Sequence, residues 1–183
     1  MPRIAKRGNI ATLDDISKLS KLRMLELIFQ NFSDVAPLVG SEIDTLELSY
    51  NVIDNVSLLH NMKRLTSFIY KGISQTAVDS LLAVPNDTIV FLNISMSPEL
   101  TSIEGIGNLQ KLKSIALNNT GIFDISPLTA LPNLESIIIS ETPCWDFSPL
   151  TNMPNLKSVM CFSNERVGLI RELFGGAPPF SVN

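Results

Sequence analysis

The feature that most constrains the fold is a repeat of about 22 residues. Two segments match position by position at that spacing, LKSIALNNTGIFDISPLTALPN from Leu112 and LESIIISETPCWDFSPLTNMPN from Leu134. Extending the register in both directions gives an apolar column with one member per repeat: Leu22, Ile43, Leu65, Ile89, Leu112, Leu134 and Leu156. Because a fixed period of this size is the signature of stacked repeat units, we expect about seven strands stacked in one solenoid.

Each repeat places further apolar residues three and five positions after the column residue, as Ile115 and Leu117 follow Leu112. Alternation with a period of two is typical of a short strand with one buried face. Two more columns complete the expected core: Phe32, Ile53, Ile73, Leu100, Ile122 and Cys144, then Val35, Val56, Ile103, Ile125 and Phe147.

The segments after the strands carry turn signals. Ser-Pro within Asp124–Leu128 and again within Asp146–Leu150 interrupts regular structure, and the leucines that follow have the spacing of one helical or 3-10 turn. The third repeat differs, since its segment from Ser74 to Pro85 has apolar residues at helical spacing. We expect a true helix there and short turns elsewhere.

The pattern L-x-x-I-x-L-x-x-T-x-I-x-D-I-S-P-L, from Leu112 to Leu128, resembles the 22-residue leucine-rich repeats of bacterial internalins and of their eukaryotic phosphatase-regulating relatives. The resemblance covers roughly residues 10–164. It implies an α/β fold, a right-handed leucine-rich-repeat solenoid with a concave parallel β-sheet, short helical or 3-10 turns on the convex side, and binding on the concave face.

The sequence departs from this family at one position per repeat. The asparagine that usually follows each strand appears as Gln30, Asn51, Ser97, Thr120, Thr142 and Asn164. Hydroxyl groups therefore replace half of the internal amide ladder, and we expect less regular stacking of the coils.

Segments outside the repeats are expected to cover the ends of the core. Residues 164–183 fit a C-terminal capping helix, with Asn164 as its cap, an apolar stripe, and Gly175-Gly176 at its end; the stripe is Val167, Ile170, Leu173 and Phe174. Residues 1–12 offer only Ile4 and Ile10 as large aliphatic residues, which makes a poorer cap and leaves open whether the chain is complete. We treat residues 1–183 as one domain.

Composition excludes several classes of function. The formal net charge of −4 lacks the basic excess of a general nucleic-acid binder. Polar residues interrupt every apolar run, so we expect no membrane insertion, and the basic start is not followed by the apolar segment of a secretion signal. With two cysteines, a reducing compartment is favoured, and we expect a monomeric, cytoplasmic protein.

No pattern of catalytic residues stands out. The single histidine, His60, lies on an outer turn away from any acidic cluster, and Cys144 and Cys161 replace aliphatic residues in core columns. Gly105 and Gly107 do not form a phosphate-binding loop, since no helix with a third glycine follows them. We therefore expect no enzyme activity, no cofactor and no metal site.

The strand residues between the buried positions should face solvent on the concave side. Their middle column reads Glu26, Glu47, Ile69, Asn93, Ala116, Ile138 and Met160. One flank reads Met24, Thr45, Ser67, Phe91, Ser114, Ser136 and Ser158, and the other reads Ile28, Ser49, Lys71, Ser95, Asn118, Ser140 and Phe162. This surface is acidic at its start and apolar at its end.

From this surface we select the candidate protein-binding residues: Glu26, Glu47, Ile69, Phe91, Asn93, Ile138, Met160 and Phe162, together with Trp145 in the loop after the sixth strand. Two alternatives stay open. The terminal segment from Ala177 to Phe180 could cover the apolar end, and Trp145 could pack across adjacent turns.

The sequence thus predicts a non-catalytic protein-interaction module that binds another protein on its concave face. The alternative is a repeat fragment of a larger exported or cell-surface adhesion protein.

Overall fold

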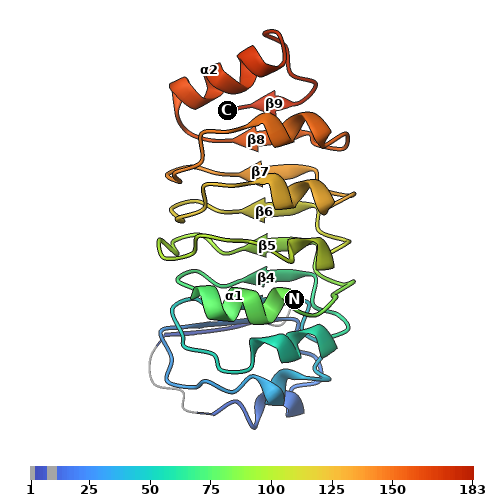
Figure 1. The fold of residues 1–183 in the computed structure, drawn as a ribbon. Helices are drawn as coiled ribbons and strands as arrows, with labels where there is room; N and C mark the ends of the chain where they lie inside the picture. The colour runs from blue at the N-terminus through green and yellow to red at the C-terminus, as the bar shows by residue number, and fades with distance from the viewer. Residues whose placement is uncertain (1–2, 8–11) are drawn as a thin grey trace.

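The structure is a computed structural model that describes residues 3–7 and 12–183, and it is a right-handed solenoid built on one parallel sheet (Figure 1). The strands follow one another in the sheet in the order of the chain, without crossovers. They are β1 (Arg3–Arg7), β2 (Met24–Ile28), β3 (Thr45–Glu47), β4 (Ser67–Ile69), β5 (Phe91–Asn93), β6 (Ser114–Ala116), β7 (Ser136–Ile138), β8 (Ser158–Met160) and β9 (Ser181–Val182).

The register of the seven inner strands, β2 to β8, is the one that the 22-residue repeat predicts. Leu46 on β3 pairs with Leu25 on β2 and with Phe68 on β4, and all three side chains are buried. The backbone hydrogen bonds between strands continue past the strand ends: Leu117 N, after β6, donates to Ile138 O on β7 at 2.8 Å. The aliphatic columns therefore stack into one interior.

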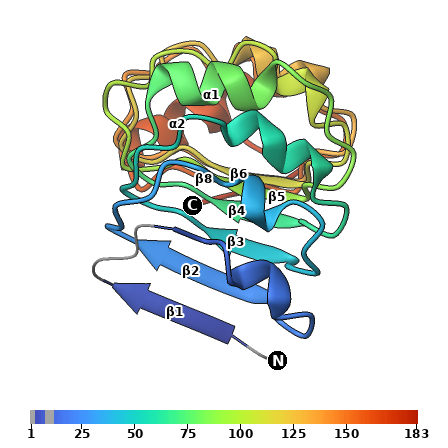
Figure 2. The same ribbon diagram turned by 90° about the horizontal axis from the view of Figure 1, so that it is seen from below.

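Short helical segments return the chain along the convex side of the sheet (Figure 2). The 3-10 segments are η1 (Ile16–Lys18), η2 (Ala36–Leu38), η3 (Val56–Asn61), η4 (Ile106–Asn108), η5 (Ser126–Ala130) and η6 (Ser148–Asn152). At both predicted Ser-Pro turns an aspartate side chain accepts the serine backbone N–H: Asp124 from Ser126 at 2.7 Å and Asp146 from Ser148 at 2.9 Å.

The helix expected in the third repeat is present as α1 (Gln75–Leu82). It begins after Ser74, whose hydroxyl accepts the N–H of Ala77 at 3.3 Å and so provides the N-cap. Its apolar face is buried against the neighbouring turn η3: Ala77, Val78, Leu81 and Leu82.

The positions after the strands form a buried polar row, as the repeat predicts, with one exception. Asn51 makes the fullest set of bonds: its Oδ1 accepts Gln30 N at 2.6 Å, and its Nδ2 donates to Leu27 O at 2.8 Å and Leu48 O at 2.7 Å. The prediction was wrong for Asn164, which is exposed on the first turn of helix α2 (Asn164–Leu173).

The N-terminal segment forms a strand that the sequence did not predict. Residues 3–7 pair with Met24–Ile28 as β1, and Ile4 packs half-buried against the core. Within residues 3–7 and 12–183 the sheet consequently has nine strands rather than about seven, because β9 is also additional. Ile10, the other aliphatic residue expected in this cap, lies outside the described residues.

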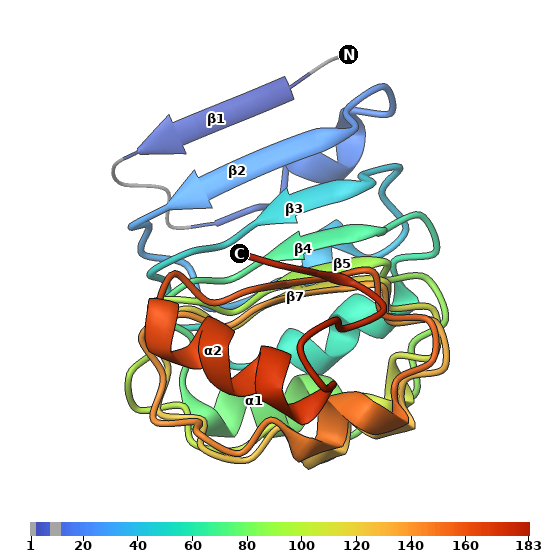
Figure 3. The same cartoon turned by 90° about the horizontal axis from the view of Figure 1, so that it is seen from above.

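The C-terminal cap consists of α2 and the tail that follows it (Figure 3). The N-cap of α2 is Ser163 rather than Asn164, since the Ser163 hydroxyl accepts Arg166 N at 3.5 Å. Of the predicted stripe, Ile170 is buried and Val167 and Phe174 are half-buried, whereas Leu173 is exposed.

The tail after α2 closes the end of the core. Gly175 and Gly176 adopt positive φ angles of 65° and 95° and reverse the chain. Phe180 then packs edge-to-face against Phe174 with ring centroids 5.1 Å apart, and Val182 pairs with Val159 in the sheet.

Candidate functional site

The predicted concave row exists as a physical row of side chains. Strand pairing places its members side by side in the expected order: Glu26, Glu47, Ile69, Asn93, Ala116, Ile138 and Met160. All are half-buried except Ala116, which is buried. The helical segments lie on the opposite side of the sheet (Figure 2), so this face is open.

One flank of the row also pairs as expected and includes Phe91, which is half-buried between Ser67 and Ser114. On the other flank the prediction of solvent exposure was wrong for Ser49, Ser95 and Ser140, which are buried. The first two serines bond to the next coil, because Ser49 Oγ accepts Lys71 N at 3.2 Å and Ser95 Oγ accepts Asn118 N at 3.1 Å. They connect coils and do not offer a binding surface.

The acidic start of the face is partly neutralised by β1. An Arg3 guanidinium nitrogen lies 2.5 Å from Glu26 Oε2, and this hydrogen bond raises the pKa of Arg3. Glu47 accepts a hydrogen bond from Ser49 Oγ at 2.9 Å. Arg3 was not predicted to lie beside this face, because no pattern in the sequence indicates a strand at residues 3–7.

The apolar end of the face stays open to solvent. Ile138 and Met160 pair across β7 and β8, and both are half-buried. The tail does not fold over them: Ser181 and Val182 pair with Ser158 and Val159, which extends the sheet by one strand at its edge.

Phe162 does not occupy the flank position predicted for it. Its φ of 40° places it in a series of left-handed residues just past the strands: Phe29, Tyr50, Met96, Asn119, Glu141 and Phe162. Phe162 is 71% exposed, and Phe29 stacks on Tyr50 with centroids 4.6 Å apart and rings 7° from parallel. The exposure of these three aromatic residues was not predicted, because no pattern in the sequence marks left-handed positions filled by large residues.

Trp145 is half exposed, and it also packs against the next coil. The Arg166 guanidinium lies 4.7 Å from the centre of the indole ring, a distance suited to a cation–π interaction. Arg166 is buried and donates to Thr142 Oγ1 at 3.3 Å and to the carbonyl of Thr142. It therefore takes the place in the polar row that was expected for Asn164.

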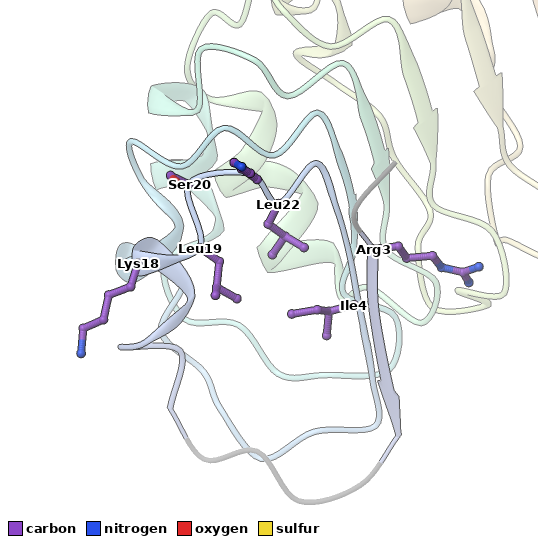
Figure 4. Close-up of a pocket in the computed structure, with 7 residues that line it drawn as sticks. Arg3, Ile4, Lys18, Leu19, Ser20 and Leu22 are labelled. Carbon is purple, nitrogen blue, oxygen red and sulfur yellow. The ribbon is translucent and has the colours of Figure 1, made fainter.

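A separate hollow of about 400 Å³ lies at the N-terminal end of the solenoid. In Figure 4 the side chains of Ile4, Leu19 and Leu22 point into it, and Lys18 points away. It is the open end of the apolar core, since Leu19 remains 43% exposed.

The two cysteine thiols are free and buried, and the histidine ring contacts a backbone carbonyl. Burial raises the pKa of the Cys144 thiol to about 11 and also raises that of Cys161. His60 is half-buried on η3, with its ring Nδ1 against the carbonyl of Ser57. Within residues 3–7 and 12–183 no three metal-ligating side chains cluster, and no helix there is long and apolar enough to span a membrane.

No protein-family model matches the sequence, and no curated protein matches it. Solved structures do share its fold. An internalin C2 from Listeria monocytogenes is 27% identical with a TM-score of 0.61, and the match covers 84% of this chain and 67% of that one. An internalin (inlF) from the same species is 22% identical with a TM-score of 0.56, over 90% of this chain and 56% of that one.

A leucine-rich-repeat protein from Leptospira interrogans is 16% identical with a TM-score of 0.65, and the match covers 100% of this chain. It covers 48% of that chain, so the present chain spans between about half and two thirds of the length of these three structures.

Proposed function

Because the chain is a leucine-rich-repeat protein of the short, internalin-like class, we propose that it is a non-catalytic module that binds another protein on the concave face of its sheet. The supporting observation is the pair Ile138 and Met160, which lie side by side and half-buried on a sheet face that no helical segment covers. Apolar groups left accessible on such a face favour contact with a partner, and methionine is enriched in interface cores.

The proposal assigns different roles to the two ends of the face. Ile138 and Met160 at one end, and Ile69 beside Glu47, provide apolar contact area. Glu47, which has no ion pair among the described residues, and Glu26, which is paired with Arg3, provide charge that orients the partner. Phe91 and Asn93 lie between these ends and contribute a ring and an amide.

The test compares partner capture by the wild-type chain with that by an Ile138→Asp variant. The matched control is Asn152→Asp, which adds the same charge at an exposed position on the convex segment η6. A partner retained by the wild type and the control should be lost by Ile138→Asp, while the thermal midpoints stay within a few degrees of one another. Equal retention by Ile138→Asp would exclude the concave face as the binding surface.

A second candidate is that these repeats serve in a larger exported or cell-surface adhesion protein. The observation that favours it is that the two internalin structures extend beyond the part that matches, which is 56% of one and 67% of the other. Protease treatment of intact source cells, followed by detection of the chain with an antibody, distinguishes a cell-surface location from a cytoplasmic one. Surface protease should remove the antigen in the first case and spare it in the second.

A further inference from the structure

A groove of about 280 Å³ lies where the last two coils meet helix α2, beyond the ends of β7 and β8. Five of its lining residues matter for its chemistry: Ser140, Glu141, Trp145, Phe162 and Arg166. The groove is distinct from the concave row, since Ile138 and Met160 do not line it.

Ser140 supplies an unused polar group in this groove. Its side chain is 5% exposed, and its Oγ has no hydrogen-bond partner among the described residues. The equivalent serines Ser49 and Ser95 accept a backbone N–H from the next coil. Ser140 lacks such a bond, and the residue opposite it, Phe162, has turned into the left-handed region. A buried hydroxyl without a partner is costly, and it is satisfied if a ligand bonds to it.

Arg166 supplies a buried positive charge. It is 7% exposed, and no carboxylate of the described residues lies within ion-pair distance of it. Its bonds to Thr142 leave guanidinium N–H groups unused, since arginine has about five. Buried arginines are usually paired, and the planar guanidinium matches a carboxylate well.

We propose that this groove binds a carboxylate side chain, Asp or Glu, of a partner protein. Arg166 and Ser140 donate hydrogen bonds to the carboxylate oxygens, and the rings of Trp145 and Phe162 cover the methylene groups of the side chain. The proposal rests on the proposed function for the protein nature of the partner, and it adds a second contact outside the concave row.

Glu141 makes the sign of the ligand charge testable. It is exposed at the rim of the groove, where it repels a carboxylate and would attract a cation. Replacing it by glutamine should therefore strengthen binding of an acidic ligand and weaken binding of a basic one.

The experiment uses the peptide acetyl-Leu-Glu-Leu-amide and its Gln and Lys counterparts as probes for the full chain. Trp145 is the only tryptophan, so its fluorescence reports on this groove and on the neighbouring hollow beside Leu169. Loss of the response in Ser140→Ala assigns it to the groove, because Ser140 does not line the neighbouring hollow. The glutamate peptide should bind with a Kd on the order of millimolar and at least about fivefold more tightly than the glutamine peptide, since charge-assisted hydrogen bonds are the stronger ones. Ser140→Ala should weaken it about tenfold, and Glu141→Gln should strengthen it about twofold.

Two results with the wild-type chain would overturn the proposal: no saturable response to the glutamate peptide, or equal affinity for the glutamine peptide. A third would be that the lysine peptide binds more tightly than the glutamate peptide and that Glu141→Gln weakens its binding. Ser140→Ala and Glu141→Gln leave Arg166 in place, so its contacts with Thr142 and Trp145 are kept in both variants. Ile138→Asp should leave peptide binding unchanged, so failure at this groove is distinguishable from failure of the concave-face proposal.

Discussion

The ring of Tyr50 lies against the Cα of Gly72: a Cβ added at Gly72 would be 2.7 Å from Cδ1 of Tyr50. Gly72 has a φ of 70°, in the left-handed region. The same tyrosine ring stacks on Phe29. One exposed aromatic pair on the rim of the sheet thus depends on the absence of a side chain in the next coil.

Replacing Gly72 by alanine should lower the free energy of unfolding more than replacing Gly40. Both glycines have positive φ angles, so alanine at either position must adopt a left-handed backbone conformation, which costs about 1–2 kcal/mol. Only Gly72→Ala also displaces the Tyr50 ring, because a Cβ at Gly40 meets nothing within 4 Å. Gly72→Ala should therefore cost about 1 kcal/mol more than Gly40→Ala in chemical denaturation, because the Phe29–Tyr50 ring stack is lost. This difference between the two variants should disappear when Tyr50 is also replaced by alanine. Equal effects of the two alanines in the wild-type background would contradict the contact.

The inner coils could be predicted from the sequence because their determinants are local and repeated. The apolar column through Leu112 and Leu134 recurs in every inner coil and gives the strand period, and the Ser-Pro turns indicate the return path in two of the coils. The end strands β1 and β9 carry no such signal. β1 is mostly basic and β9 has two residues, and both form only because a neighbouring strand offers them an open edge.

The candidate site was predictable only in part, for a related reason. Strand alternation identifies the row through Ile138 and Met160, since orientation follows from periodicity. It cannot identify Arg166 beside Trp145, because that contact joins a loop to the capping helix outside the repeat. It also placed Phe162 wrongly, since the last coil turns one residue earlier than the 22-residue period predicts: positive φ occurs at Glu141 and next at Phe162.

Asn51 should contribute more stability than Thr120, although the two occupy equivalent positions. The Asn51 amide bonds to Gln30 N, Leu27 O and Leu48 O, whereas the Thr120 hydroxyl donates only to Leu117 O at 2.8 Å. We expect Asn51→Ala to cost about 3 kcal/mol and Thr120→Val about 1 kcal/mol in urea unfolding. If Thr120→Val is as costly as Asn51→Ala, the number of bonds to the buried groups does not set the stability of the coils.

Stability should fall between about pH 9 and pH 11 because of Cys144. Burial raises the pKa of its thiol to about 11 in the folded chain, so the unfolded chain loses this proton first as the pH rises. The unfolded state then binds fewer protons, and the free energy of unfolding decreases through that window and is unaffected below it. Between about pH 9 and pH 11 the free energy of unfolding of Cys144→Ala should fall less steeply than that of the wild type. Every other ionisable group is the same in the two proteins, so the difference reports on Cys144. Parallel profiles would show that the thiol is not desolvated in the folded state.

Phe180 should hold the last strand in place. It is buried against Phe174, and it precedes a strand whose bonds include Cys161 N to Asn183 O at 2.7 Å and Asn183 N to Val159 O at 3.1 Å. Phe180→Ala should remove about 3–5 kcal/mol of packing next to a strand of only two residues. Amide hydrogen exchange at Cys161 and Asn183 should therefore accelerate at least tenfold, while Leu117 N in the central coils stays protected. The control is Pro179→Ala at an exposed neighbour; if both variants leave Cys161 equally protected, β9 is held by its backbone bonds and not by the ring.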